Sequence, residues 1–330
     1  MPNVFYEIMK KIFTGIQASG RPHLGNLLGA ILPALTLAEN PTHQSIFFIA
    51  DLHAMTTVKN AIQIKENTYD VAAAWLACGL DPEKILFYRQ SQLPEVSELL
   101  WYLSCVAPFP MLANAHAFKS KAEKLADVNA GLFTYPVLMA ADILLWDAHE
   151  IPVGKDQIQH IEIARDLAQN FNQHYGEIFV LPEAKLEKHH LIIPGIDGQK
   201  MSKSYKNVID IFLPEAALRK QVMSIQTDSK AVEDIKDPET CNIFQIFKTV
   251  ASEIEITALK DKYLQGGYGY GQAKNDLLQV LLNRFAETRI AYQTYRENIE
   301  VLEEILQKSE EKCRFFTQKK IKEIRKVLGF

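Results

Sequence analysis

The sequence lacks several features that mark other classes of protein. Its 330 residues include only four cysteines, Cys78, Cys105, Cys241 and Cys313, and none of them forms a Cys-x-x-Cys pair. This spacing argues against a protein-bound zinc or iron–sulfur site and provides no disulfide framework. No stretch approaches the roughly 20 apolar residues that a membrane-spanning helix requires. The N-terminal residues have no cationic leader before an apolar run, so we expect no secretory signal, no membrane contact and a cytoplasmic location.

A strong net charge is also missing. Lysine and arginine total 36 against 40 acidic residues, and the formal net charge of −4 does not by itself indicate a nucleic-acid-binding protein. Basic residues are nevertheless concentrated between Lys312 and Lys326, where Glu323 is the only acid. Such a run is most often a solvated helix face, although it could also lie against RNA or against another part of the chain.

The first 200 residues alternate between short apolar runs and longer segments with helical spacing. Aromatic and β-branched residues are frequent in Lys11–Ile16, Ser45–Ala50 and Lys84–Arg89, as buried parallel strands require. Helical spacing extends over Leu24–Glu39 and Ala61–Cys78. The alternation predicts the α/β fold class, with a doubly wound parallel sheet of the Rossmann type that binds a nucleotide. In such sheets ligands collect at the carboxyl ends of the strands.

Strand signals stop after about Ser204. Pro214 opens a helical stretch, and helical spacing continues to the C-terminus apart from a glycine-rich break at Gln265–Gly271. We therefore predict two domains: a Rossmann-type domain over residues 1–204 and an all-helical domain over residues 205–330.

The segment that follows the first strand has the composition of a phosphate site. Gly20 allows a tight turn, and His23 stands at the start of the next helix, where free N–H groups and the helix dipole favour anions. Asn26 follows three residues later on the same face, and Gly25 leaves room for a flat ring against the backbone. Pro33 should kink this helix. The alternative is a plain glycine turn with a surface histidine, and no G-x-G-x-x-G pattern is present.

A second polar segment, Gly198–Ser204, carries two lysines three residues apart. Lys200 and Lys203 could neutralise charge on a triphosphate as pyrophosphate leaves, while the hydroxyl groups of Ser202 and Ser204 add hydrogen-bond donors. On composition alone, an ordinary surface loop explains the segment equally well.

The order of these residues resembles the signatures of the class I aminoacyl-tRNA synthetases. Lys-Met-Ser-Lys-Ser at residues 200–204 is identical to one signature, and Pro-His-Leu-Gly-Asn at residues 22–26 is similar to the other, the His-x-Gly-His type. Asn26 in place of the last histidine is a variant of the tryptophan and tyrosine branch. The ordered pair of motifs is far more specific than either motif alone.

Further segments resemble the tryptophanyl-tRNA synthetases, from Ile12 to at least Asn172 and more loosely to the C-terminus. The segments that carry this resemblance are Thr14–Gly20, Ala50–Thr56, Thr134–Leu144 and Pro152–His160. The family usually has proline where Ala18 stands, which changes only the stiffness of that turn.

Asp142 is unusual because it lies in an otherwise apolar helical segment. An ionised carboxylate there is costly unless it has a partner. The partner is either internal, such as a backbone N–H or an arginine, or it is the indole N–H of a tryptophan substrate. A phenol hydroxyl also donates, so the carboxylate alone does not separate tryptophan from tyrosine.

The resemblance implies ATP-dependent activation of L-tryptophan followed by transfer to tRNA(Trp), with Mg²⁺ arriving on the triphosphate and no metal held by the protein. It also implies a homodimer with tRNA laid across both subunits and a helical domain that reads the anticodon.

Three groups of residues follow from the resemblance. The catalytic group is His23, Asn26, Lys200 and Lys203. The ATP-binding group is Gln17, Ser19, Gly25, Asn26, Lys121, Gly154, Asp156, Lys200, Met201, Ser202 and Lys203. The tryptophan-binding group is Phe13, Gly15, Gln17, Tyr135, Met139, Asp142, Val153 and Gln157.

Several of these residues also have ordinary structural explanations. Phe13, Met139 and Val153 read equally well as core, Asp156 as a helix cap, and Lys121 as a solvated lysine. We expect His53 and His160 to be structural hydrogen-bonding groups rather than catalysts. Three other functions stay open: a tyrosyl-tRNA synthetase, another adenylyl-transferring enzyme of this fold, and a non-catalytic synthetase-like RNA-binding protein.

Overall fold

The computed structural model describes residues 9–115, 118–119, 128–154, 157–186 and 193–330. Within these residues the chain forms a five-stranded sheet of order β3-β2-β1-β4-β5, and every neighbouring pair of strands is parallel. The strands are β1 (Lys10–Gln17), β2 (His43–Ala50), β3 (Leu86–Arg89), β4 (Glu150–Val153) and β5 (Glu183–Leu186). The predicted α/β fold and its first three strands are confirmed, whereas β4 and β5 were not predicted.

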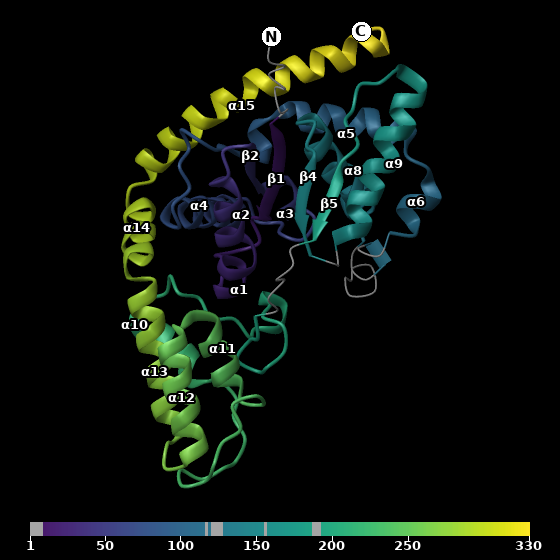
Figure 1. The fold of residues 1–330 in the computed structure, drawn as a ribbon. Helices are drawn as coiled ribbons and strands as arrows, with labels where there is room; N and C mark the ends of the chain where they lie inside the picture. The colour runs from purple at the N-terminus through teal and green to yellow at the C-terminus, as the bar shows by residue number, and fades with distance from the viewer. Residues whose placement is uncertain (1–8, 116–117, 120–127, 155–156, 187–192) are drawn as a thin grey trace, which may run out of the picture.

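Helices cover both faces of the sheet, as Figure 1 shows. Alternate residues of β2 enter two different cores: Phe47 packs against Trp75 on one face, and Phe48 stacks against Phe13 and Tyr88 on the other. This two-sided burial explains the unbroken apolar run in that strand. The helical elements of this part are α1 (Leu24–Asn26), η1 (Leu27–Ile31), α2 (Leu32–Ala38), α3 (Asp51–Ala54), α4 (Ala61–Ala77), η2 (Gln90–Gln92), α5 (Pro94–Val106), α6 (Phe109–Ala113), α8 (Ala130–Leu145) and α9 (Ile158–Tyr175).

The helical run after β1 contains a local irregularity where a proline kink was expected. Leu27–Ile31 forms a π-helical turn directly before Pro33. A proline has no N–H, and its ring crowds the carbonyl four residues earlier, so a wider turn relieves the crowding.

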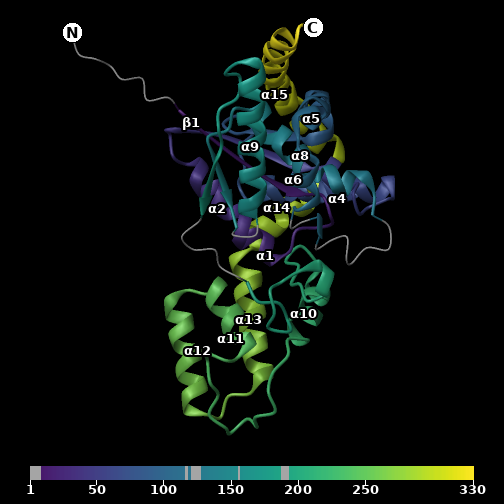
Figure 2. The ribbon, with the colours of Figure 1, turned by 90° about the vertical axis from the view of Figure 1, so that its right-hand side faces the viewer.

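The remaining helices form a second region, together with a short 3-10 turn, η4 (Lys203–Tyr205). Figures 1 and 2 show α10 to α13 lying apart from the sheet, while α14 and α15 run back to it. The expected glycine-rich break separates α12 from α13. These helices are α10 (Glu215–Met223), α11 (Asn242–Val250), α12 (Glu253–Gln265), α13 (Tyr270–Arg284), α14 (Ala286–Glu297) and α15 (Ile299–Leu328). No described helix is long and apolar enough to cross a membrane.

Part of the basic C-terminal run pairs with the sheet-containing region. Lys320 on α15 is buried, and its Nζ lies 2.7 Å from Asp147, which follows α8. Lys312 Nζ lies 2.6 Å from Glu83. The position of α15 against the sheet therefore accounts for these two lysines without RNA. The boundary at residues 204 and 205 remains a prediction, because α14 and α15 contact both parts of the chain.

Candidate functional site

A cavity of about 410 Å³ opens at the carboxyl ends of β1 and β4. The strand order changes direction between these two strands, which is where ligands bind in open parallel sheets. The cavity wall includes residues of β1, α8 and β4, the helical run after β1, and Lys200. Most of the residues predicted to bind substrates meet here. Those that line the cavity are Phe13, Gly15, Gln17, Asn26, Tyr135, Met139, Val153, Gly154, Gln157 and Lys200.

Regular elements hold the apolar part of the wall. The ring of Phe13 stacks on Phe48 with centroids 4.8 Å apart. A Cβ added at Gly15 would collide with the Phe48 ring, so this position of β1 has no room for a side chain. The Gln17 Nε2 donates to the backbone carbonyl of His53 at 3.0 Å, which fixes the amide at the end of the strand. Packing and hydrogen bonding within the chain therefore fix this part of the wall.

Asp142 has internal partners, but they are not the ones expected from the sequence. It is fully buried, and the Gln90 Nε2 donates to both of its oxygens at 2.9 and 2.8 Å. His53 Nε2 lies 3.1 Å from Oδ2. Burial raises the pKa of Asp142, while the His53 and Gln90 hydrogen bonds oppose that rise. Among the described residues Asp142 is not part of the cavity wall.

His53 connects Asp142 to the cavity. Its side chain is 3% exposed and lines the cavity, and its ring lies 4.2 Å from that of Tyr135. With an ionised Asp142 accepting from Nε2–H, the buried Nδ1 is left as an acceptor with no hydrogen-bond partner among the residues that the structure describes. The expectation that His53 is a hydrogen-bonding group is confirmed. His160 is buried too, with its ring 5.8 Å from that of Tyr135.

The start of the helical run presents His23 and Asn26 as predicted. Asn26 Oδ1 accepts from the His23 backbone N–H at 3.1 Å, which orders the first turn. Burial, and then the neighbouring Lys203 ammonium, lower the pKa of His23 to about 4. His23 is therefore uncharged at neutral pH and offers a hydrogen bond rather than a positive charge.

The loop Lys200–Ser204 lies against this helix start. The Gly25 backbone N–H donates to the Met201 sulfur at 3.3 Å, and Met201 is 4% exposed. The Leu24 backbone N–H donates to the Ile209 carbonyl at 2.8 Å. The two signature segments, far apart in sequence, are thus in direct contact.

Asn207 was not predicted as part of the site. It is 1% exposed; its Oδ1 accepts from the Ser202 N–H at 2.7 Å, and its Nδ2 donates to Asp197 at 2.8 Å and to the Lys200 carbonyl at 3.1 Å. One buried amide therefore holds the loop at both Lys200 and Ser202. Nothing in its local sequence distinguishes it from an ordinary loop asparagine.

Lys203 takes a different position from Lys200. Lys203 is not part of the cavity wall that the described residues form, and its ammonium lies beside Gly20. Burial lowers the pKa of Lys203 to about 8, against the opposing effect of Asp210 and Asp70.

The remaining predicted site residues either form hydrogen bonds through backbone groups or lie outside the described residues. Ser19 is exposed, and its N–H donates to the Gln17 carbonyl at 2.8 Å. The Gly154 carbonyl accepts from the Gln157 N–H at 3.0 Å. Lys121 and Asp156 lie outside the described residues. No group of three or more histidine, cysteine or acidic residues in the described part of the chain could hold a metal ion.

Comparison with known proteins gives one consistent result. The family model of the class I tRNA synthetases for tryptophan and tyrosine matches residues 9–286. A tryptophan–tRNA ligase of Campylobacter jejuni is 46% identical over 319 residues, which cover 97% of this chain and 99% of that protein. One from Fusobacterium nucleatum is 43% identical, covering 97% and 98%.

A solved structure agrees with the sequence relatives. The tryptophanyl-tRNA synthetase of Campylobacter jejuni, complexed with ADP and tryptophan, has a TM-score of 0.93 at 46% identity. The similarity covers 97% of this chain and 100% of that one.

Proposed function

The chain belongs to the class I tRNA synthetases of the tryptophan and tyrosine group, and within it to the tryptophan–tRNA ligases, and we propose from this membership how its residues act. The reaction is the ATP-dependent ligation of L-tryptophan to tRNA. The observation that supports our assignment of roles is one cavity at the ends of β1 and β4, where apolar residues lie in the same wall as Asn26 and Lys200.

We propose that the indole ring lies against Phe13, Met139 and Val153. The solved relative that binds tryptophan has the same fold over nearly the whole chain. Tyr135 and Gln157 would also line the ring pocket, and Gln17 and Tyr135 would lie near the amino group.

Asp142 remains the proposed acceptor of the indole N–H. Its two oxygens take three donor contacts, two from Gln90 and one from His53. A carboxylate has about four acceptor positions, so one remains on Oδ1 for a further donor. Phenylalanine would leave that acceptor unpaired in a closed site, which is a strong basis for rejection.

In the activation step the tryptophan carboxylate attacks the α-phosphate of ATP and pyrophosphate leaves. The attacking group is already an anion, so the step needs positioning and charge stabilisation rather than a strong base. We assign charge stabilisation to Lys200 and Lys203, and hydrogen bonding to Asn26 and the neutral His23. The ATP contacts of Ser19, Gly25, Met201 and Ser202 would come largely through backbone groups.

Two further ATP contacts are proposed on the resemblance. Gly154 and Asp156 would hold the ribose, and Lys121 would reach the phosphates, although Asp156 and Lys121 lie outside the described residues. Mg²⁺ would arrive with the triphosphate, since this ion commonly binds through substrate phosphates and waters rather than through a full set of protein ligands.

Closure of the loop Lys200–Ser204 would bring Lys203 to the phosphates. Lys200 already lines the cavity, whereas Lys203 lies beside Gly20 and outside the described wall. A movement of the loop is therefore needed for both lysines to act together, as in other enzymes that close a loop over substrate.

The tRNA and dimer contacts are proposals as well. The helical region over residues 205–330 would read the anticodon, in the cytoplasm where tRNA is charged. Trp101 on α5 and Phe109 on α6 are 69% and 70% exposed, and a second copy of the chain would cover them.

The function is tested by amino-acid-dependent ATP–pyrophosphate exchange with tryptophan, tyrosine and phenylalanine in parallel. We expect exchange with tryptophan alone. Exchange with tyrosine would keep the mechanism and overturn the specificity, and no exchange with any of the three would favour a non-catalytic protein.

A further inference from the structure

Five charged residues from four separate segments meet beside the loop Lys200–Ser204, outside the cavity. We call them the junction cluster: Arg21, Asp70, Lys203, Asp210 and Arg296. Arg21 follows β1, Asp70 lies on α4, Lys203 and Asp210 come from the loop and the segment after it, and Arg296 lies on α14.

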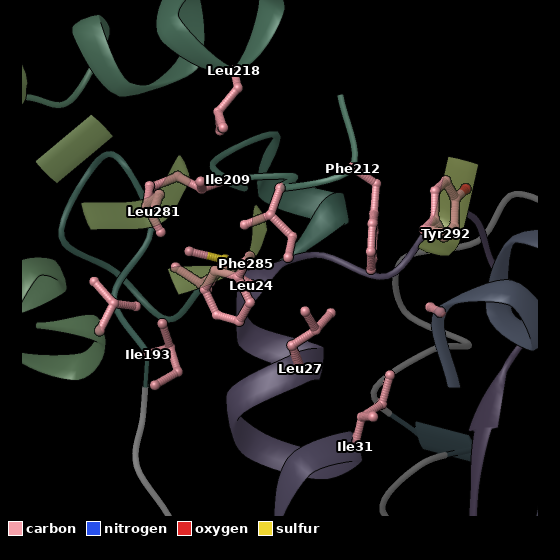
Figure 3. Packing of buried hydrophobic residues seen from close by; sticks show 14 of the residues in the cluster. Leu24, Leu27, Ile31, Ile193, Ile209, Phe212, Leu218, Leu281, Phe285 and Tyr292 are labelled. Carbon is pink, nitrogen blue, oxygen red and sulfur yellow. The ribbon is translucent and has the colours of Figure 1, made fainter. Parts of the chain in front are cut away.

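Asp70 is the member that connects to the helical region. It is 8% exposed, and its Oδ1 accepts from the Tyr292 hydroxyl at 2.6 Å and lies 2.8 Å from Arg296 Nε. Tyr292 in turn stacks on Phe212 with centroids 4.0 Å apart, as Figure 3 shows. The other oxygen of Asp70 lies 4.0 Å from Arg21 Nε.

Asp210 ties the same cluster to the start of the first helical run. Its Oδ2 accepts from Arg21 Nη1 at 3.3 Å. The Asp210 backbone N–H donates to Gln221 on α10 at 2.9 Å, and the preceding Ile209 carbonyl accepts from Leu24 at 2.8 Å. Apolar residues from both regions surround these contacts, among them Leu24 and Ile209, which Figure 3 labels.

Lys203 is the cluster member that can reach the substrate. Its ammonium lies over Gly20, where an added Cβ would be only 3.2 Å from Nζ, and Gly20 has a positive φ of 128°. Among the described residues Lys203 forms no ion pair within 4.0 Å, yet both Asp70 and Asp210 favour its charged form. The ammonium therefore lies within the electrostatic influence of two carboxylates, one on α4 and one in the segment after the loop.

The junction cluster contains three cations and two carboxylates, and Glu66 adds a third carboxylate by pairing with Arg296 from the exposed side. The numbers of positive and negative side chains are therefore equal. Within the described part of the chain, Arg21 Nε and Arg296 Nη1 are buried and have no hydrogen-bond partner. Loss of the Asp70 charge would leave Asp210 as the one carboxylate of the cluster that favours the charged form of Lys203. It would also leave Arg21 with Asp210 and Arg296 with Glu66 as their remaining ion-pair partners among the described residues. The electrostatic environment that favours the Lys203 ammonium would therefore be weakened.

We propose that Asp70 is a positioning residue for Lys203, and that its bonds to Tyr292 and Arg296 connect the catalytic loop to α14 of the helical region. This inference rests on the proposed function, because it assigns Asp70 an effect on the activation step. Asp70 does not touch substrate; it acts through the lysine.

The test is single-turnover formation of tryptophanyl-adenylate, with the burst amplitude counting folded active sites. We expect Asp70→Asn to slow the rate constant about tenfold, a size typical of coupling between neighbouring charged residues. The matched control is Glu66→Gln, which removes the other carboxylate bonded to Arg296, one turn earlier on α4, and should leave the rate within about twofold of wild type. An Asp70→Asn rate equal to that of wild type would overturn the proposal.

A double-mutant cycle separates positioning from a merely structural role. In a Lys203→Ala background, Asp70→Asn should cause no further slowing, because the group through which it acts is absent. An equal slowing in both backgrounds would overturn the proposal.

The link to α14 is tested by Tyr292→Phe, which removes one hydroxyl and keeps the stacking on Phe212. It should slow activation in the same direction as Asp70→Asn, and the two changes together should be less than multiplicative. If the effects of Tyr292→Phe and Asp70→Asn simply multiply, the two residues act independently and the proposed link to α14 is wrong. A wild-type enzyme that forms no adenylate with tryptophan would overturn the proposed function and this inference together.

Discussion

The wall of the cavity at the ends of β1 and β4 and the loop Lys200–Ser204 are held in place by different means. The wall comes from β1, α8 and β4, and its polar backing of Asp142, Gln90 and His53 is almost fully buried. The loop has little regular structure and depends on Asn207 and on the contact between Met201 and Gly25. A wall fixed by the sheet suits selective binding, whereas a loop held by a few polar bonds can move during the reaction. Substitutions in the two regions should therefore affect different kinetic constants.

The largest expected effect is on the loop. Lys203→Ala should slow adenylate formation by about 100- to 1000-fold, because it removes the positive charge that we propose stabilises the departing pyrophosphate. Lys206→Ala, a nearby lysine outside the signature, is the matched control and should retain most of the rate. Pyrophosphate exchange at saturating substrates measures both. An unaltered Lys203→Ala rate would remove this residue from the mechanism.

Behind the wall, Asp142→Ala should lower kcat/KM for tryptophan about 100-fold, since it removes the proposed indole acceptor and the buried partner of His53 and Gln90. Asp147→Ala, just beyond the end of the same helix and paired with Lys320, is the control. Exchange kinetics over a range of tryptophan concentrations give the comparison. Equal losses in the two variants would mean that Asp142 acts only through stability.

Asn207→Ala should have a smaller effect than Lys203→Ala, and it should act on the rate of activation, as other changes in the loop do. The two hydrogen bonds that order Lys200 and Ser202 are lost together with the one to Asp197, so we expect activation to slow about tenfold with little change in the KM for tryptophan. Asn298→Ala, at an exposed site between α14 and α15, is the control. A KM for tryptophan that rises as much as kcat falls would show that the loop also shapes the cavity.

The smallest effect concerns pH. The pKa of His23 is lowered to about 4 from 6.5, so between these values the unfolded chain binds more protons than the folded one. Stability therefore falls as the pH is lowered through this window, by on the order of 1–2 kcal/mol from this group. Urea unfolding at pH 7 and pH 5 should show a smaller loss for His23→Gln than for wild type. An identical loss in both proteins would contradict the burial of a neutral His23.

The contrast between regular elements and segments that depend on distant contacts also explains which parts of the fold could be predicted from the sequence. Strands β1 to β3 were predicted because aromatic and β-branched residues fill both faces of the sheet. Strands β4 and β5 are four residues each, with charged residues or a proline, and they form strands through their pairing with β1 and with one another.

The site residues that could be predicted are those that lie in recognisable sequence motifs. The signature segments identified Asn26 and Lys200, which line one cavity. The partners of Asp142 could not be predicted, because His53 and Gln90 lie 89 and 52 residues away and only the fold brings them together. Asn207 and Asp70 were missed for the same reason: their roles depend on contacts across the fold and not on their neighbours in sequence.

The most direct test of the separation between wall and loop is a tryptophan titration of single-turnover activation by Lys203→Ala. The titration yields both a plateau rate and a half-saturating tryptophan concentration. We predict a plateau lowered by about 100-fold or more, with half-saturation within about twofold of wild type. A half-saturating concentration that rises by as much as the plateau falls would contradict the division of binding and catalysis between the two regions.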